Sequence, residues 1–356
     1  MSSGDTKLTD YPYANPGYGR KVAVVGIGSA GCRISSQLSK ESRLLEHFVY
    51  VSCDDHDIAN ITKGERILID ATSKNKSTPY AVRGLAESKL ASIRQQMKDS
   101  ELVIIITGLG GSVGSGIAPL IAREAKENGS TIVAFVVMPF NFEKSKHFFA
   151  GGALKQIRNY ASGVILLDND ELLEKKDMSV IDAFSFLNQR IALALNKLLG
   201  STEVHDFSVG LNNVVDFVRT NSYSVMCLGE ENDDHQCRQA VMNAASHFDK
   251  IVDKREALKS IVHVSADKSL TMKDLVGSIG GLSGILGNGS MQIEYGFSAN
   301  SSSCSTAIIM ATGFSHTKFD NYDPVDRALK SNCYNLEQEL DAALDADMLL
   351  PNVEMG

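Results

Sequence analysis

The sequence has no apolar stretch as long as a membrane-spanning helix, which needs about 20 predominantly apolar residues, although 43% of its 356 residues are hydrophobic. Its first ten residues have neither the apolar core of a secretion signal nor the cationic character of a transit peptide. These absences exclude a transmembrane protein on composition and predict a cytoplasmic protein.

Paired cysteines and basic clusters are also missing. The six cysteines form no C-x-x-C pair and have no histidine at the spacing of a zinc site. Because disulfide frameworks and structural zinc sites need such patterns, we expect reduced thiols and no metal site. The net charge is −8, with no run of lysine and arginine. Nucleic-acid binding is therefore not expected, since phosphate backbones are held by clustered basic side chains.

Short apolar runs alternate with helical patterns in the first half of the chain. The runs lie at 21–25, 48–51, 102–106, 131–137 and 163–167, and the helical patterns at 31–40, 82–98, 116–128 and 145–161. Continuous apolar strands separated by helices are typical of a parallel sheet covered on both faces. We therefore predict an α/β domain with a Rossmann-like parallel sheet over residues 21–178, after a mobile N-terminal arm at 1–20.

A long helix at 179–200, with one apolar stripe, is expected to divide the chain. Beyond it we predict a smaller α+β domain at 201–316 and a C-terminal tail at 317–356. Its elements are helices at about 213–227 and 236–249, strands at 260–264, 291–296 and 305–313, and a glycine-rich loop at 277–289. The acidic stretch 336–350 of the tail is either a fraying surface helix or a partner-binding peptide.

The first glycine-rich loop directly follows the first predicted strand. Gly26, Gly28 and Gly31 form the pattern G-x-G-x-x-G and open a helical segment. Glycine lets the backbone turn tightly beside a phosphate, and a helix amino end presents unpaired N–H groups and a positive dipole. Asp54 lies where a dinucleotide-binding fold places the acid that contacts ribose, so an NAD-dependent dehydrogenase remains an alternative.

The second glycine-rich loop, G-L-G-G-S-V-G-S-G at 108–116, lies between another buried strand and another helix. In a parallel sheet its amides face the same carboxyl edge as the first loop. Two cradles fit a nucleoside di- or triphosphate, whereas a dinucleotide fold uses one glycine turn for its pyrophosphate. Neither loop has the pattern G-x-x-x-x-G-K-[ST], which excludes the common P-loop NTPases.

Several motifs resemble, in their order along the chain, those of the tubulin/FtsZ superfamily, and the similarity covers residues 20–316. Segments 139–143, 168–173 and 183–188 are similar to the family's ribose segment, its P-N-D-x-L-L loop and the start of its guanine-reading core helix. One loop is similar to the first phosphate loop of archaeal FtsZ, and the other to the signature G-G-G-T-G-[ST]-G; their residues are Gly28, Ser29, Ala30, Gly31, Cys32, Gly110, Gly111, Ser112, Val113, Gly114, Ser115 and Gly116.

The resemblance implies a tubulin/FtsZ fold that binds GTP or GDP, with or without Mg²⁺, through these loops. It further implies that Asn188 contacts guanine, that Phe184 stacks on the base and that Asn169 supports this contact. An amide suits guanine because it both donates and accepts hydrogen bonds. Glu143 is expected to bind the ribose hydroxyls, and His147 stands where the family often has an arginine near the phosphates.

The hydrolytic positions depart from the family pattern. In this family a loop of the next subunit, N-x-D-x-x-D, supplies the acids that polarise the attacking water. In the aligned stretch 212–217 those acids fall on Val214 and Phe217, while Asp216 is one residue out of register. Asp216 is the catalytic candidate if this loop is rebuilt; otherwise Val214, Val215 and Phe217 are expected to pack as a helix. Losing the acids should slow hydrolysis by orders of magnitude.

Three further departures lie at the phosphate end. Val113 replaces the signature threonine and removes a hydroxyl donor, and His147 carries a charge that depends on pH. The family's G-A-G-x-x-P loop reads K-N-K-S-T-P at 74–79. Its Lys74 and Lys76 either bind phosphate by charge or belong to a solvated loop.

We therefore expect a guanine-nucleotide-binding, FtsZ-like protein of the cytoskeleton or of cell division, with weak or absent GTP hydrolysis. It should self-associate through its nucleotide face as a dimer or filament, or with another FtsZ-family protein. One alternative is a competent polymerising GTPase that uses Asp216. The other is a non-hydrolysing scaffold that caps or recruits a partner filament through the tail.

Overall fold

A computed structural model describes residues 21–71, 78–173, 178–199, 209–220, 222–231, 237–267, 270–287, 289–299 and 304–323. The predicted N-terminal arm, Lys74, Lys76 and the tail stretch 336–350 lie outside the described residues, so the expectations for them stay predictions. Within the described ranges, no helix combines the length and the apolar character that crossing a membrane requires.

The N-terminal half contains a parallel sheet in the order β3-β2-β1-β4-β5-β6. Its strands are β1 (Val22–Ile27), β2 (His47–Ser52), β3 (Glu65–Leu68), β4 (Leu102–Gly108), β5 (Thr131–Met138) and β6 (Gly163–Asp168). The inner strands are buried almost throughout, which explains their continuous apolar runs. The sequence did not predict β3, a four-residue edge strand that begins with the exposed pair Glu65 and Arg66.

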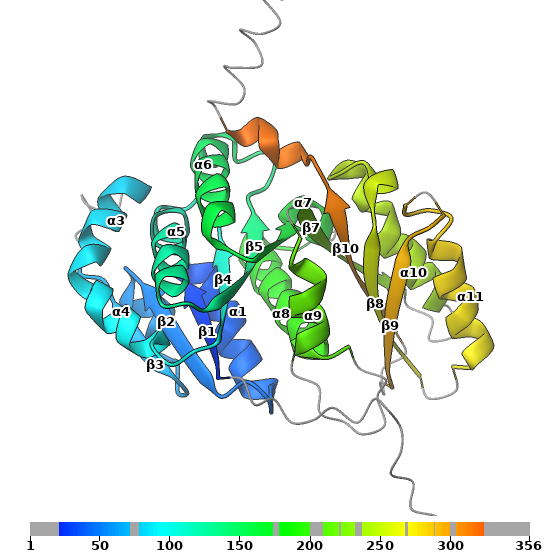
Figure 1. The fold of residues 1–356 in the computed structure, drawn as a ribbon, viewed down its shortest axis with the longest axis horizontal. Helices are drawn as coiled ribbons and strands as arrows, with labels where there is room; N and C mark the ends of the chain where they lie inside the picture. Colours follow the sequence, from blue (N-terminus) through cyan, green and yellow to red (C-terminus); the bar gives the residue numbers. More distant parts are fainter. Residues whose placement is uncertain are drawn as a thin grey trace, which may run out of the picture.

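Helices cover both faces of this sheet, as predicted (Figure 1). One face packs against α3 (Pro79–Ala86), α4 (Leu90–Met97), α5 (Ser112–Glu127) and α6 (Lys144–Tyr160). The other face packs against α1 (Gly28–Glu41), the long helix α8 (Val180–Leu199) and α9 (Leu211–Val218). Two short helices, α2 (Asp55–Ile58) and α7 (Asn169–Leu173), follow β2 and β6.

The C-terminal half continues the sheet. The additional strands are β7 (Tyr223–Glu231), β8 (Lys259–Ala266), β9 (Gln292–Ala299) and β10 (Ser305–Phe314), in the order β7-β10-β8-β9. Strand β7 pairs in parallel with β6 and antiparallel with β10, so the ten strands form one mixed sheet. Helices α10 (Cys237–Ser246) and α11 (Met272–Leu282) pack on one side of this part. The predicted mixed α+β character is confirmed.

Two element predictions in this half were wrong. The helix predicted at 213–227 ends at Val218, and residues from Tyr223 form β7; both segments are apolar, so the sequence showed no change of period between them. The loop predicted at 277–289 is helical as far as Leu282. Helix α11 buries Leu275 and Ile279 on one side, and its glycines lie on the open side.

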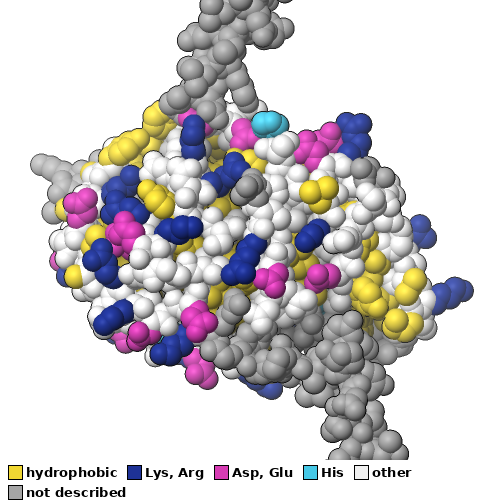
Figure 2. Space-filling model, viewed as in Figure 1, with side chains coloured by type: hydrophobic (Ala, Val, Ile, Leu, Met, Phe, Trp, Pro, Cys, Tyr) yellow, Lys and Arg dark blue, Asp and Glu magenta, His cyan; other side chains and the backbone are white. Residues whose placement is uncertain are grey.

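The surface carries charges of both signs. On the face seen in Figure 2, basic and acidic side chains are interspersed rather than gathered into one large basic area. Hydrophobic side chains gather at the lower right of this view, over the region of α11, where Met272 and Val276 are exposed.

After β10 the chain returns to the N-terminal half. Residues 315–323, which we call the strap, include the 3-10 helix η4 (Lys318–Tyr322) and lie against α6 (Figure 1, orange). The approach is close, because a Cβ added to Gly151 of α6 would lie 2.4 Å from the carbonyl carbon of Tyr322. The sequence had assigned most of this segment to the tail.

Candidate nucleotide-binding site

The two glycine-rich loops lie side by side at the carboxyl edge of the sheet. They follow β1 and β4, which are neighbours, with Ile27 paired to Thr107. Gly28 has φ +68° and Gly110 has φ +94°, conformations that favour glycine. A Cβ on Gly28 would lie 3.4 Å from the backbone nitrogen of Gly114. The prediction that two cradles face one edge is confirmed.

Two helices begin at these loops without a side-chain cap. The N-cap residues of α1 and α5 are Ile27 and Gly111; neither side chain caps its helix, and neither helix has an acidic residue in its first turn. By contrast, Asp54 caps α2 and Thr78 caps α3. The first-turn N–H groups at 28–30 and 112–114 therefore have no intrahelical partner and can receive an anion.

The loop residues divide into those that face open space and those that are packed. Gly111 and Ser29 are exposed, and a Cβ on Gly111 would meet nothing within 4 Å. A Cβ added to Gly31 would lie 2.2 Å from the carbonyl oxygen of Ile106. A Cβ added to Gly114 would lie 2.0 Å from the carbonyl oxygen of Gly108. The packed glycines therefore allow close helix–strand contact.

The side chains of three loop residues predicted to contact nucleotide instead contact other parts of the protein. Ser115 accepts a 2.8 Å hydrogen bond from the N–H of Gly110, inside the loop. The thiol of Cys32 is buried at 3.4 Å from the carbonyl oxygen of Gly26, and burial raises its pKa above the usual range. Val113 is half-buried against the core. Their contacts with nucleotide stay predictions, and for Cys32 and Val113 only the backbone offers a hydrogen bond there.

The loop between β5 and α6 holds its own polar groups. Glu143 accepts a 3.1 Å hydrogen bond from the N–H of Phe140 and forms an ion pair with Lys146. His147 donates from Nε2 to the carbonyl oxygen of Phe140 at 3.1 Å, and its ring stacks on Tyr322 with centroids 3.7 Å apart. A ribose contact by Glu143 would therefore share a carboxylate that already stabilises this loop.

Phe184, the residue predicted to stack on the base, lies beside two further aromatic rings. Phe184 lies edge-on to Phe140, with ring centroids 5.7 Å apart, and Phe140 stacks on Phe142 at 5.2 Å. Asn188 follows Phe184 by one turn of α8 and is half-buried, so the two share one helix face. The sequence missed Phe140 and Phe142 as aromatic partners, although their position directly after a buried strand could have indicated them.

At the junction of β6 and α7, which we call the β6–α7 turn, Asn169 lies between Asp168, the last residue of β6, and Asp170. Asp168 is buried and forms an ion pair with Lys318 of the strap, and Asp170 accepts a 2.8 Å hydrogen bond from the N–H of Asn141. Burial raises the pKa of Asp168, despite the opposing effect of the lysine ammonium. Sequence reasoning missed Lys318, whose partner is 150 residues away.

Helix α9 lies at the opposite edge of the sheet from the glycine-rich loops. Arg219 donates to the hydroxyl of Thr131, the first residue of β5, and lies 3.4 Å from Asp216. The eight residues of β5 at about 3.3 Å each place this edge about 25 Å from the loops. Asp216 is exposed, while Val214 and Phe217 are buried. The helix-packing interpretation is confirmed, and Asp216 faces away from its own subunit's site.

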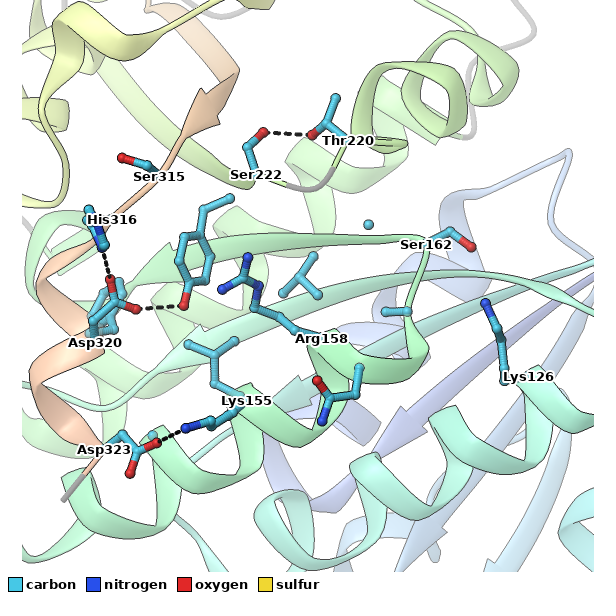
Figure 3. Close-up of a pocket in the computed structure, with 18 residues that line it drawn as sticks. Lys126, Lys155, Arg158, Ser162, Thr220, Ser222, Ser315, His316, Asp320 and Asp323 are labelled. Carbon is cyan, nitrogen blue, oxygen red and sulfur yellow. Dashed lines mark hydrogen bonds and ion pairs between the residues drawn. The ribbon is translucent and has the colours of Figure 1, made fainter. Parts of the chain in front are cut away.

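A cavity of about 680 Å³ lies elsewhere, between the C-terminal half of α6, the start of β7 and the strap (Figure 3). Its charged groups are largely paired: Lys155 with Asp323 at 3.1 Å, and Asp320 with the hydroxyl of Tyr223 at 2.6 Å and with His316 at 3.5 Å. None of the predicted nucleotide-binding residues lines it. It is therefore not part of the candidate site.

Known proteins agree with this architecture. Residues 21–177 match the family described as Tubulin/FtsZ family, GTPase domain. Among curated relatives, Cell division protein FtsZ 2 of Halobacterium salinarum is 27% identical over 264 residues, 72% of this chain and 67% of that protein. FtsZ 2 of Methanocaldococcus jannaschii is 26% identical over 263 residues, 71% of this chain and 69% of that protein.

Solved structures share the fold. A point mutant of FtsZ from M. jannaschii superposes with TM-score 0.73 at 22% identity, over 85% of this chain and 94% of that one. CetZ2 from Haloferax volcanii, described as a GTPγS-bound protofilament, gives 0.66 at 19% identity, over 88% and 99% of the two chains. Residues 21–177 are thus a tubulin/FtsZ-family GTPase domain, and most of the chain is similar in sequence to FtsZ proteins of archaea.

Proposed function

We propose that this protein binds GTP or GDP where the glycine-rich loops meet, self-associates through that face in a cytoskeletal or cell-division process, and hydrolyses GTP weakly or not at all. The observation that carries the proposal is the pair of abutting, uncapped helix amino ends of α1 and α5. Two such ends provide N–H donors and positive dipoles for one polyphosphate chain.

The base end supports a guanine nucleotide. An amide at Asn188 can pair with both a donor and an acceptor of guanine, and the exposed edge of Phe184 offers a stacking surface beside Phe140. The loop of β5–α6 and the turn of β6–α7 border this space, joined by the hydrogen bond from Asn141 to Asp170. Ribose binding by Glu143 requires its carboxylate to accept from a hydroxyl as well as from Lys146.

Weak hydrolysis is supported by what fills the catalytic positions. Val214 and Phe217 lie in the core, so no carboxylate from these positions can orient water. Val113 lacks the hydroxyl of the signature threonine but keeps its backbone N–H. The phosphate cradle is therefore retained while the groups that would activate water are not.

The positions of the glycine-rich loops and of α9 at opposite edges of the sheet support head-to-tail self-association. The loops and α9 lie at opposite ends of the parallel strands, so stacking one subunit on the next brings α9 onto the nucleotide face. Structures of relatives are described as an FtsZ dimer and a CetZ2 protofilament. The exposure of Asp216 favours a second candidate, a polymerising GTPase in which this acid reaches the neighbour's nucleotide.

The test is a matched pair of substitutions at the cradle, Gly111→Asp and Gly111→Asn. Both side chains fit, since nothing lies within 4 Å, and both can cap α5. Only aspartate adds a negative charge beside the phosphates. We expect Gly111→Asp to weaken fluorescent GTP and GDP binding at least about tenfold relative to Gly111→Asn, a difference of about 1.4 kcal/mol.

Nucleotide extracted from the purified wild-type protein should be GTP or GDP. If chromatography of the extract shows neither, and titration shows no binding of either, the proposal fails. If the two Gly111 variants bind GTP and GDP with equal affinity, the phosphates do not lie beside the amino end of α5.

A further inference from the structure

The strap is anchored independently of the nucleotide site. The N–H of Lys318 donates to the carbonyl oxygen of Ile251 at 2.8 Å, and Phe319 is fully buried. Thr317 and Asp320 cap η4 reciprocally. The strap therefore has a defined position, with an anchor in the C-terminal half of the protein, from which its side chains reach the N-terminal half.

Lys318 reaches the turn that contains Asn169. Its ammonium pairs with the buried carboxylate of Asp168 and lies 4.0 Å from Asp170. Asp168 in turn accepts a 3.2 Å hydrogen bond from the N–H of Asp170, which closes the turn around Asn169. Removing the lysine would leave a buried carboxylate without its counter-ion, and the turn would have to rearrange or take up a proton.

Tyr322 reaches the other side of the site. Its ring stacks on His147 at 3.7 Å with an interplanar angle of 14°, and His147 holds the carbonyl oxygen of Phe140. Phe140 is the residue whose ring meets Phe184 and whose N–H holds Glu143. One segment thus contacts both the first turn of α6 and the turn after β6, and these border the base and ribose positions from two sides.

We infer that Lys318 and Tyr322 are positioning residues of the nucleotide site, which hold the β6–α7 turn and the start of α6 in the arrangement that receives guanine and ribose. This inference rests on the proposed function. By linkage, docking of the strap and binding of nucleotide stabilise each other. Because Lys318 acts through the base side of the site, its loss should affect GTP and GDP equally.

The test compares Lys318→Met with Lys155→Met in the full-length protein. Both substitutions remove a lysine that links the strap to the N-terminal half, but Lys155 pairs with Asp323, away from the turn that Lys318 contacts. We expect Lys318→Met to raise the dissociation constants of fluorescent GTP and GDP about tenfold by the same factor, and Lys318→Arg to restore them. Lys155→Met should leave both constants near the wild-type values, and equal weakening by the two Met variants would reduce Lys318 to a general structural role.

A second measurement separates this inference from the proposed function. Hydrogen exchange without nucleotide should be faster over residues 168–173 in Lys318→Met than in wild type or Lys155→Met. If the wild-type protein binds no guanine nucleotide, the proposed function fails, and exchange still decides whether Lys318 holds the turn. Unchanged exchange at 168–173, or unchanged affinity in Lys318→Met, overturns the inference.

Discussion

The proposed base end of the site and helix α9 both contain positions that align with functional residues of the family, but the side chains at these positions differ in exposure. At the base end, Phe184 and Asn188 lie at a half-exposed surface, and charged pairs from the C-terminal half hold the adjoining turn. At α9, the positions of the family's acids are filled by Val214 and Phe217, which are 0% and 4% exposed. The first region keeps side chains available to a ligand, whereas the second has turned them inward.

If hydrolysis is weak, as proposed, this difference implies that one substitution at α9 should not restore it. The core formed by α8, α9 and one face of the sheet includes Val214, Val215 and Phe217. These residues now stabilise the fold, and a carboxylate in their place would be withdrawn from water. At α9, apolar residues that pack in the core therefore replace the family's acids, and the helix does not leave an open site where those acids would lie.

The sharpest test of this contrast restores the family's acid at a core position. Val214→Asp should lower the free energy of unfolding by about 4 kcal/mol, because it buries a carboxylate without a partner. Chemical denaturation measures the loss. The control is Asn212→Asp, an exposed change in the first turn of the same helix, which should be nearly neutral. A Val214→Asp protein that is as stable as wild type and releases more phosphate would show that position 214 can hold a working acid, against the view that it is a core position.

At the base end, Asn188→Ala should weaken guanine-nucleotide binding about tenfold and reduce the preference for GTP over ATP. The physical reason is that guanine would lose a partner for both a donor and an acceptor in a partly buried place. Isothermal titration with GTP, GDP and ATP measures both effects. The neighbouring exposed Gln189→Ala is the matched control. An unchanged preference for GTP over ATP would place guanine recognition elsewhere.

Charged contacts at the base end should also make it sensitive to acid, unlike the apolar α9. Glu171 of α7 accepts hydrogen bonds from Nδ1 of His247 and from Lys250, each at 2.6 Å. Burial alone would raise the pKa of Glu171, but these two donors bring it below the ordinary 4.5. A carboxylate with a lowered pKa stabilises the folded state above its unfolded pKa, and this contribution is lost as pH falls through the folded value.

Glu171→Gln should therefore reduce the free energy of unfolding by about 1–3 kcal/mol at pH 7, the cost of losing buried hydrogen bonds to charged groups. The gap to wild type should shrink as pH falls below 4.5. Urea denaturation from pH 7 to pH 3 measures it, and exposed Glu87→Gln should show no such trend. A gap that stays constant with pH would mean that the ionisation of Glu171 does not contribute.

The sequence predicted those parts of the fold that are determined locally. Strands β1, β4, β5 and β6 are buried on both faces, so each reads as an unbroken apolar run between glycine-rich or polar loops. The glycine-rich loops could be predicted because positive φ at Gly28 and Gly110 and close packing at Gly114 demand glycine. Strand β7 was missed because α9 and β7 are both apolar and short.

The strap could not be predicted from local patterns. Lys318 and Asp168 are 150 residues apart, and a lysine in a polar stretch gives no sign of a buried partner. The aromatic contacts of Phe140 with Phe184, and of His147 with Tyr322, likewise join segments that are distant in sequence. Contacts of this kind depend on how separate elements pack on the sheet, which follows from the whole sheet rather than from any one element.

The smallest effect is expected at Asp216. Its side chain is 71% exposed, and its 3.4 Å contact with the exposed Arg219 is of the surface type that contributes little. It is also one position out of register with the family's acids, so Asp216→Ala should leave phosphate release unchanged. Because this acid can act only on a neighbouring subunit, the informative measurement is phosphate release as a function of protein concentration. Release that rises steeply with concentration in wild type and disappears in Asp216→Ala would favour the polymerising GTPase, and would show that α9 contributes to catalysis from a position the family pattern does not use.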